Sequence, residues 1–329
     1  MSYGSSEVLG LSQNFMESRI MLSGAELNLF TILSSAPLSA QEVASRIGAN
    51  LRALTIILDA LSAMGLLVKQ RGTYQCANSV SPFLSEHSPN SVLPMVLHAG
   101  HLWQRWSALT DVVQGTMASK DAAKYSQTPE DLRAFIGAMD VLATPRGGEI
   151  VAAVDASSSK MLLDVGGASG TYTIAFLQAV PEMRATLFDK PEVIEMARER
   201  LSKAGVLNRV TLVPGDFYHD ELPRGHDLAF VSAIIHQNSL EQNLDLFNKV
   251  FRSLNRRGRI IIRDHVMEPD RIHPKEGAIF AVNMLLGTPG GTTYTYGEIK
   301  TGLSQAGFIG MRLLKKGEHM DALIEALKP

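Results

Sequence analysis

The sequence predicts an α/β protein in two parts, an N-terminal part that is all-helical apart from one small hairpin and a C-terminal part built on a parallel sheet. Apolar residues between positions 12 and 150 recur at helical spacing. After residue 157, short apolar runs alternate with amphipathic segments. The chain has 329 residues, which is enough for two domains. We expect boundaries at 1–98, 99–150 and 151–329, where the middle range is a helical linker.

Composition excludes several classes of function. The chain has 31 basic and 33 acidic residues and a formal net charge of -2, so we expect no nucleic acid or anionic membrane as a partner. Cys76 is the single cysteine, which excludes intrachain disulfides and zinc sites of several cysteines. The polar N-terminus does not resemble a signal peptide, and no apolar run approaches the ~18 residues of a membrane span. We therefore expect a cytoplasmic protein.

The N-terminal part has the element order of a winged helix. Its first apolar periodicity consists of Ile20, Leu22, Ala25, Leu29, Ile32 and Leu33. Ser39 is a typical N-cap for a short helix that ends near Gly48, and Asn50 opens a third helix that runs to Met64. Residues 66–75 then predict a hairpin whose turn is the polar run 69–72.

A winged helix raises the possibility of DNA binding. The helix that would enter the groove carries Arg52 and no other basic residue before Lys69. A groove reader needs several Lys, Arg, Asn or Gln side chains on its exposed face. The sequence therefore favours a packing and dimerisation module.

The next helical segment is rich in aromatic and imidazole groups. His98 and His101 lie three residues apart in the run that ends at Trp106, as in the wall of a pocket. Two histidines at this spacing can bind a metal, but no nearby carboxylate completes a set of ligands. Packing or surface roles are favoured, and we expect no metal site.

The C-terminal part alternates strands with helices. The expected strands are 161–165, 184–188, 209–213, 227–232 and 259–264, and the clearest helices between them are 191–204 and 240–254. This alternation predicts a parallel sheet covered by helices on both faces. Ligands in such folds bind beyond the C-terminal ends of the strands.

Three strand ends carry residues suited to an adenosine ligand. The run Asp164-Val165-Gly166-Gly167-Ala168-Ser169-Gly170 follows the first strand, and its glycines allow a sharp turn and a close approach to a ligand. Its spacing does not match the NAD fingerprint G-x-G-x-x-G. Asp189 ends the second strand, where a carboxylate binds ribose hydroxyls, although it also suits a helix cap before Pro191. Gly215-Asp216-Phe217 follows the third strand and offers an acid and a flat ring to adenine. Together they favour S-adenosylmethionine over other adenosine ligands.

With these motifs the chain resembles the S-adenosylmethionine-dependent O-methyltransferases of the plant caffeic acid and hydroxyindole type. The resemblance spans nearly the whole chain. It includes the winged-helix dimerisation domain, the run 164–170 in place of D-V-G-G-G-T-G, Gly215-Asp216-Phe217, His236 and the C-terminal region from Ala306 to Ala326. It implies a Rossmann-like methyltransferase sheet and a homodimer formed through the N-terminal domain.

The resemblance also implies roles for individual residues. The cofactor would be contacted by Gly166, Gly167, Asp189, Gly215, Asp216, Phe217 and Ser232, although many relatives carry a lysine or arginine near the last position. Phe135 and Met139 match an F-x-x-x-M pattern that lines the acceptor pocket. Their helical spacing suits core packing equally well.

His236 occupies the position of the family's catalytic base. A phenol with a pKa of ~10 is mostly protonated at neutral pH, and a histidine with a pKa of ~6.5 can remove its proton during the attack on a methyl group. The chain departs from the usual H-D-W, because Gln237 and Asn238 follow the histidine. Asp264 matches a family glutamate that helps the base, and His265 is an alternative partner.

A second family glutamate, in the loop after Gly290-Gly291, is missing from this chain. Thr293 stands at its position, and Glu298 is expected to begin the following helix instead. We expect methyl transfer to a hydroxyl of a small aromatic or polyketide-like acceptor. A C- or N-methyltransferase, a regulatory protein that binds adenosylmethionine and an NAD-linked enzyme remain alternatives.

Overall fold

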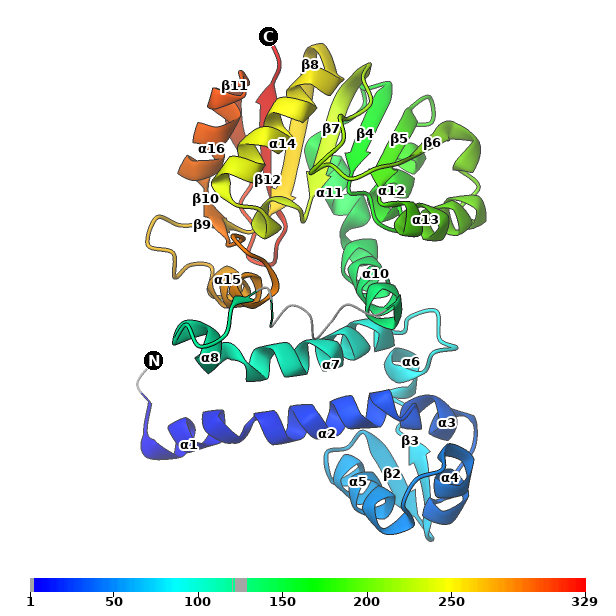
Figure 1. Cartoon of the computed structure of the whole chain (residues 1–329). Coiled ribbons are helices and arrows are strands. Elements are labelled where there is room, and N and C mark those ends of the chain that lie inside the picture. The colour runs from blue at the N-terminus through cyan, green and yellow to red at the C-terminus, as the bar shows by residue number, and fades with distance from the viewer. Residues whose placement is uncertain (1–2, 120, 122–128) are drawn as a thin grey trace. The chain divides into compact units, whose positions relative to one another are not determined.

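Figure 1 shows the computed structural model of the chain, which describes residues 3–119, 121 and 129–329. The chain divides into two compact units. Unit 1 comprises residues 1–103 and 128–141, and unit 2 comprises residues 104–127 and 142–329.

Unit 1 is a helical winged-helix module with a small sheet. Its elements are α1 (Ser5–Gln13), α2 (Phe15–Glu26), α3 (Leu29–Ser35), β1 (Leu38–Ser39), α4 (Ala40–Ile47), α5 (Leu51–Ala63), β2 (Leu67–Gln70), β3 (Thr73–Cys76) and α6 (Ser81–Leu84). Most of α7 (Leu93–Ser107) and α10 (Pro129–Ala143) also belong to it. The first apolar periodicity is split between α2 and α3, because Asn28 adopts a left-handed conformation between them.

The helix ends of unit 1 form where the sequence predicts them. The Ser39 side chain accepts a hydrogen bond from the Glu42 backbone N–H, and the Glu42 carboxylate accepts one in return from the Ser39 backbone. This is a capping box. Gly48 ends α4 with a φ of 67°, and the Asn50 side chain caps α5. The predicted caps at Ser39 and Asn50 are confirmed.

The hairpin is longer than the sequence predicts. Lys69 and Gln70, expected in the turn, belong to β2, and the turn itself is only Arg71-Gly72. Both turn residues have positive φ, as a two-residue turn between twisted strands requires. Polar residues are typical of turns, and the four polar residues therefore predict a turn. Two of them instead belong to β2, because β2 is an exposed strand and its side chains can be polar. A third strand, β1, pairs with β3 and was not predicted.

Unit 2 contains a seven-stranded sheet in the order β11-β12-β8-β7-β4-β5-β6. Its strands are β4 (Met161–Val165), β5 (Arg184–Asp189), β6 (Val210–Pro214), β7 (His226–Ser232), β8 (Leu254–Asp264), β11 (Ile309–Lys315) and β12 (Ala322–Leu327). Its helices include α8 (Leu109–Val113), α11 (Gly147–Val154), α12 (Thr171–Ala179), α13 (Pro191–Lys203), α14 (Leu240–Ser253), α15 (Lys275–Gly287) and α16 (Tyr296–Gln305). A second, two-stranded sheet pairs β9 (Val266–Met267) with β10 (Tyr294–Thr295). The five predicted strands are all present.

The five predicted strands are parallel, as expected, but the sheet also contains two strands outside that prediction, and one of them is antiparallel. β8, β7, β4, β5 and β6 are parallel, but β12 runs antiparallel to both β8 and β11. Only residues 316–321 join β11 to β12. So short a connection returns the chain as an antiparallel neighbour, whereas a parallel neighbour needs a longer crossover.

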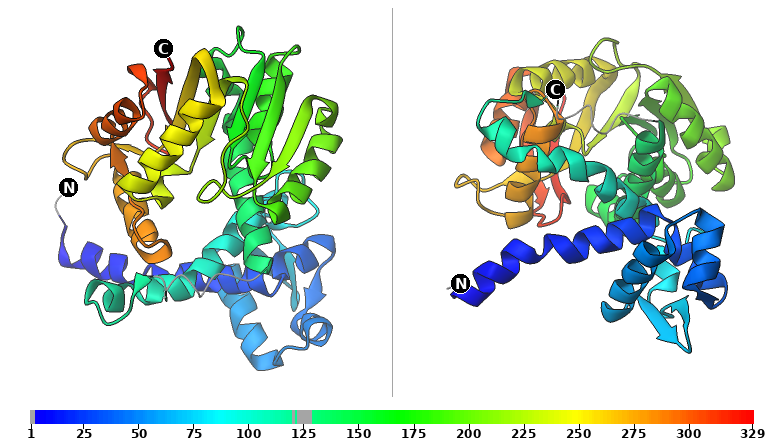
Figure 2. Two further views of the ribbon diagram at one scale, coloured as in Figure 1. Left: turned by 45° about the horizontal axis from the view of Figure 1, so that its top comes forward. Right: turned by 60° about the horizontal axis from the view of Figure 1, so that its bottom comes forward.

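Helices cover both faces of the sheet, as the sequence predicts. On one face, Leu163, Val231 and Ile262 pack with α14 and α16. On the other, Phe230 and Ile261 pack with α11, α12 and α13. Successive residues of one strand therefore point to opposite faces. Figure 2 lets the reader follow the sheet from the red and orange strands at one edge to the green strands at the other.

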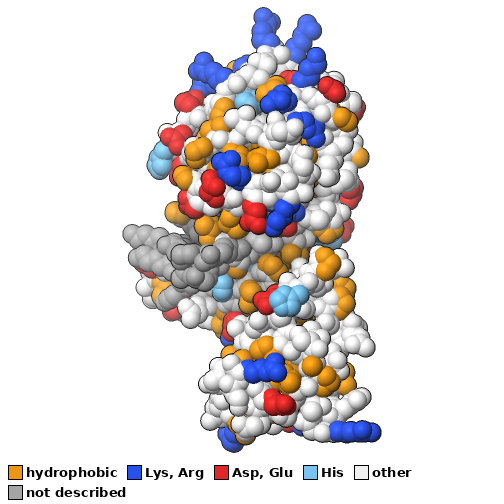
Figure 3. All heavy atoms as spheres, turned by 90° about the vertical axis from the view of Figure 1, so that its right-hand side faces the viewer, with side chains coloured by type: hydrophobic (Ala, Val, Ile, Leu, Met, Phe, Trp, Pro, Cys, Tyr) orange, Lys and Arg blue, Asp and Glu red, His pale blue; other side chains and the backbone are white. Residues whose placement is uncertain are grey.

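In unit 1, the first basic residue after α5 is held in a polar cluster. Lys69 in β2 is paired with Asp59 at 2.6 Å, and Asp59 also accepts a hydrogen bond from Tyr74. In Figure 3 both signs of charge are present on the face shown, and the lower part of that face carries few basic side chains. Within the described residues, no helix combines the length and the apolar character needed to cross a bilayer.

The Ser39 cap gives a test of the N-terminal fold. Ser39→Ala removes the acceptor of the α4 capping box, and we expect the free energy of unfolding to fall by about 1 kcal/mol. Urea unfolding followed by circular dichroism measures it. Ser45→Ala, at an exposed position within the same helix, is the control and should cost less. Equal effects of the two substitutions would contradict the capping role.

Candidate active site

The functional residues of unit 2 gather at the C-terminal edge of the parallel strands. Val165, Asp189, Pro214, Ser232 and Asp264 end β4, β5, β6, β7 and β8. Because the register pairs Val165 with both Phe188 and Val231, and Ser232 with Arg263, these ends lie side by side. The loops that leave them carry the motifs identified in the sequence.

The glycine-rich loop after β4 is tightly packed. Gly166 has a φ of 66°, and a Cβ there would lie 2.5 Å from the Ile234 side chain. A Cβ on Gly167 would lie 2.7 Å from Leu187. Ala168 also has a positive φ, of 49°. The absence of side chains at Gly166 and Gly167 therefore lets the turn fit against its neighbours, as a cofactor cradle requires.

Asp189 holds this loop in place. Its Oδ2 accepts a hydrogen bond from the Ala168 N–H at 2.8 Å, and its Oδ1 accepts one from the Lys190 N–H at 2.7 Å. The alternative interpretation of Asp189 as a helix cap before Pro191 is wrong, because Lys190 is the N-cap of α13. Burial raises the pKa of the Asp189 carboxyl.

Asp164 connects β4 to α12, the two elements that flank the loop. Its carboxylate accepts a 2.6 Å hydrogen bond from the Thr173 hydroxyl of α12, and it is 2% exposed. Burial raises the pKa of Asp164 to about 6. The cause is desolvation, which disfavours the charged form.

The loop after β6 presents Asp216 and Phe217. Asp216 Oδ1 accepts a hydrogen bond from the Tyr218 N–H at 2.9 Å. The rings of Phe217 and Tyr218 lie 4.6 Å apart. Gly215 is needed here, because a Cβ would lie 2.5 Å from the Phe188 ring.

A cavity of about 710 Å³ opens beside this loop. Its lining includes Phe217, Tyr218 and Gln237, together with side chains of α14 and residues 287–289.

His236 and Asp264 form a buried pair. Nδ1 of His236 lies 2.8 Å from Oδ1 and 3.0 Å from Oδ2 of Asp264, and the two residues are 8% and 1% exposed. A carboxylate can only accept, so Nδ1 is the donor of this hydrogen bond, and in the neutral ring Nε2 carries the lone pair. The structure thus brings the two predicted residues together. It does not pair His236 with the alternative, His265, whose pKa is lowered by burial.

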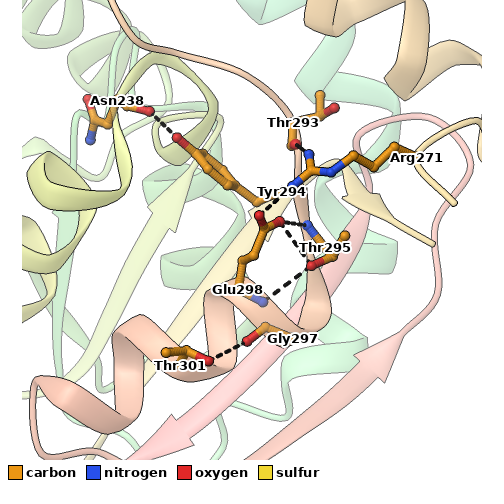
Figure 4. A network of polar contacts seen from close by, with 8 residues as sticks. All are labelled: Asn238, Arg271, Thr293, Tyr294, Thr295, Gly297, Glu298 and Thr301. Carbon is orange, nitrogen blue, oxygen red and sulfur yellow. Dashed lines mark hydrogen bonds and ion pairs between the residues drawn. The ribbon is translucent and has the colours of Figure 1, made fainter. Parts of the chain in front are cut away.

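Asn238, the second of the two residues that replace the usual Asp-Trp, anchors the loop. Asn238 is fully buried, and its Oδ1 accepts a 2.6 Å hydrogen bond from the Tyr218 hydroxyl. Its Nδ2 donates to Asn243 Oδ1, and Asn243 donates to the Ile235 carbonyl. The Tyr294 hydroxyl donates to the Asn238 carbonyl (Figure 4). Three segments therefore hold the loop that carries His236.

The loop of the missing glutamate has a structural role. Thr293 is 2% exposed, and its carbonyl accepts a hydrogen bond from Arg271. Glu298 caps α16 together with Thr295 and pairs with Arg271 (Figure 4). The expectation that Glu298 begins the following helix is confirmed. Gly291 packs so closely that a Cβ would clash with the His236 carbonyl.

The two predicted acceptor residues lie in α10, which belongs to unit 1. Phe135 is 41% exposed, and its ring meets the His98 ring edge-on at 5.4 Å. Met139 is half-buried. Their role in an acceptor pocket stays a prediction. Among the described residues, no group of three His, Cys, Asp or Glu side chains is arranged to hold a metal ion.

Sequence reasoning missed the apolar side of the His236 site. The ring of Phe280 in α15 meets the His236 ring at 4.8 Å, nearly at a right angle, and also contacts His265. One turn further along α15, Asn283 accepts a hydrogen bond from the Trp106 indole at 3.1 Å. In sequence, α15 is an ordinary apolar helix, and no motif distinguishes Phe280 from a core residue.

Comparison with known proteins decides the family. The model of an O-methyltransferase domain matches residues 112–309, and that of an O-methyltransferase dimerisation domain matches residues 9–85. The chain belongs to the O-methyltransferase family. It is therefore an S-adenosylmethionine-dependent methyltransferase, and the predicted fold, enzyme class and cofactor are confirmed.

Several relatives of this methyltransferase align over most of their length. The tetracenomycin polyketide synthesis 8-O-methyl transferase of Streptomyces glaucescens is 31% identical, with 94% of this chain and 93% of that protein covered. The 3-hydroxy-5-methyl-1-naphthoate 3-O-methyltransferase of Streptomyces sahachiroi is 28% identical, with 93% and 90% covered. Among solved structures, human N-acetylserotonin methyltransferase with S-adenosylmethionine superposes with a TM-score of 0.85 at 25% identity, over 99% of each chain.

The buried Asp164 gives a test by pH. Its folded-state pKa of about 6 lies above the ordinary value of 3.8, so the native state binds the proton more tightly. Stability from this group is therefore greatest at about pH 4 and falls as pH rises through about 6. Asp164→Asn removes this loss. We expect its unfolding free energy, relative to the unmodified chain, to rise by up to about 3 kcal/mol between those two pH values. A difference that stays constant in urea titrations across pH would contradict it.

Proposed function

We propose that this enzyme transfers a methyl group to a hydroxyl of a small aromatic, polyketide-like metabolite, with His236 as the general base. The buried hydrogen bond between His236 Nδ1 and Asp264 is the observation that carries the proposal. It leaves Nε2 as the only nitrogen of the ring able to accept a proton.

Asp264 acts through the histidine. Its carboxylate orients the ring and stabilises the positive charge that forms when Nε2 takes the acceptor's proton. Because Asp264 also accepts a hydrogen bond from the His265 N–H at 2.8 Å, its own position is fixed. His236 and Asp264 therefore act together as the general base, although the usual H-D-W sequence is absent.

Adenosylmethionine supplies an electrophilic methyl group on a sulfonium centre. Gly166 and Gly167 form the turn that would approach it, and Asp189 would accept hydrogen bonds from the ribose. Gly215, Asp216 and Phe217 would hold the adenine ring, and Ser232 lies at the end of β7 between these loops. Two observations support this assignment: the glycines are closely packed, and Phe217 lines a cavity.

Two arguments support an aromatic hydroxyl as the acceptor. The naphthoate and tetracenomycin enzymes are named as O-methyltransferases, and both align over most of the chain. Phe280 provides an aromatic surface directly against the His236 ring. Phe135 and Met139 are proposed to contribute further to the acceptor pocket, through the 99–150 segment.

The role of His236 is tested by substitution. We expect His236→Gln, which keeps the side-chain size, to lower kcat by about 10²- to 10⁴-fold with phenolic acceptors, because the base is lost. Asp264→Asn should lower kcat less and shift the pH profile of the reaction. Calorimetry with S-adenosylhomocysteine should show unchanged binding in both variants, and His273→Ala, at an exposed site, is the control.

Unchanged turnover of His236→Gln with intact cofactor binding would contradict the proposed mechanism. It would favour C- or N-methylation on the same scaffold, because such a reaction needs no base at this position. Binding of NAD in place of S-adenosylhomocysteine would contradict the proposed site as a whole.

We further propose a homodimer formed through unit 1. The matched dimerisation domain supports it. So do the exposed apolar side chains of α1 and α2, which are Val8, Leu9, Leu11, Phe15 and Met16. The chain has a mass of 35.8 kDa, and light scattering should give twice this value. Leu9→Glu together with Leu11→Glu should shift the mass towards the monomer, whereas a monomeric unmodified chain would contradict the proposal.

A further inference from the structure

At the C-terminal ends of β7 and β8, side chains alternate between the two faces of the sheet. Asp264 lies on the same face as Ile262, which packs against α14 and α16. Arg263 lies on the same face as Ile261, which packs against α11 and α12. Ser232 pairs with Arg263 in the register. Arg263 and Ser232 therefore lie on the opposite side of the sheet from the proposed catalytic pair.

Arg263 is a buried charge without a counterion among the described residues. It is 4% exposed, and its Nη1 donates a 3.1 Å hydrogen bond to Ser232 Oγ. Its Nε is buried and has no hydrogen-bond partner in the described part of the chain. Two acids, Asp264 and Asp321, act on Arg263 electrostatically, but Asp264 pairs with His236 and Asp321 pairs with Lys315 at 2.8 Å. A buried guanidinium in such a place is strongly unfavourable unless an anion satisfies it.

Tyr172 adds a second unsatisfied donor at the same place. The guanidinium carbon of Arg263 lies 5.2 Å from the centre of the Tyr172 ring. Tyr172 is 7% exposed, and its hydroxyl is buried with no hydrogen-bond partner among the described residues. A phenol hydroxyl and a guanidinium Nε–H together match the two oxygens of a carboxylate.

Arg263 and Tyr172 lie next to the glycine-rich loop, and this indicates which ligand would supply the carboxylate. Tyr172 is the second residue of α12, which begins directly after Gly170. The N-terminus of a helix carries a partial positive charge that favours anions. A carboxylate here would lie against the loop that holds the cofactor, whereas the proposed acceptor site, with His236 and Phe280, lies on the other side of the sheet.

We propose that Arg263 and Tyr172 bind the carboxylate of the methionine part of S-adenosylmethionine. Ser232 Oγ fixes the guanidinium through Nη1, which leaves Nε free to donate to the ligand. Ser232, expected from the resemblance to contact the cofactor, then acts by positioning Arg263. The inference rests on the cofactor site proposed above.

The test compares two ligands that differ only in the carboxylate, S-adenosylmethionine and its decarboxylated form, by calorimetry. The unmodified chain should bind the carboxylated ligand more tightly. Tyr172→Phe, which removes only the unpartnered hydroxyl, should reduce this preference by about tenfold, and Arg263→Met by about a hundredfold. Neither should change the affinity for the decarboxylated ligand. Arg263→Lys, which keeps a charge, should restore part of the preference.

A control separates recognition from packing. Arg259 lies on the same face of β8, where it pairs with Glu325 at 2.8 Å. Arg259→Met should lower the melting temperature but leave the preference between the two ligands unchanged. A loss of affinity for both ligands alike in Tyr172→Phe and Arg263→Met, or no loss for either, would overturn the inference.

Two further outcomes are distinguishable. If the variants keep the cofactor preference but raise KM selectively for acceptors that carry a carboxylate, the carboxylate belongs to the acceptor and the inference is wrong. If the unmodified chain binds neither ligand, the proposed cofactor site itself fails.

Discussion

The parallel register of β4, β5, β7 and β8 is the constraint on which the site depends. It places the ends of these strands at one edge, so that loops separated by up to 100 residues in the chain converge. At this edge the turn after β4 is fixed, because Asp189 accepts a hydrogen bond from the Ala168 N–H and Asp164 accepts one from the Thr173 hydroxyl. Any side chain at Gly166 or Gly167 would push this turn outwards.

The departure from H-D-W is compensated by hydrogen bonds from three neighbouring segments. Asn238 binds the Tyr218 side chain after β6, Asn243 in α14 and the Tyr294 hydroxyl in β10. Because Gly291 packs against the His236 carbonyl, the loop that lacks the second glutamate still contributes to the site through its backbone. The chain therefore holds its histidine with a neutral network and one charged partner, Asp264.

Alternation along β8 gives adjacent residues separate tasks under the two proposals. Asp264 faces the side of α14 and α16 and orients the base, whereas Arg263 faces α12 and binds the carboxylate of the cofactor. The sulfonium centre would then lie between a fixed anchor and a fixed base. Such pre-organisation lowers the barrier to an in-line displacement, because the reacting groups are already oriented when they meet.

The resemblance to a known family implied that His236 and Asp264 are partners. The sequence by itself determined the winged-helix order, the five parallel strands and the glycine-rich turn. These follow from local signals, namely periodicity, caps and motifs at strand ends, which depend on neighbours in the chain. Only the tertiary structure decided the antiparallel β12, the pairing of Phe280 with His236, and the isolation of Arg263 beside Tyr172. Each of these depends on residues distant in sequence, and burial turns an ordinary strand arginine into an unsatisfied charge only when the sheet and α12 have packed.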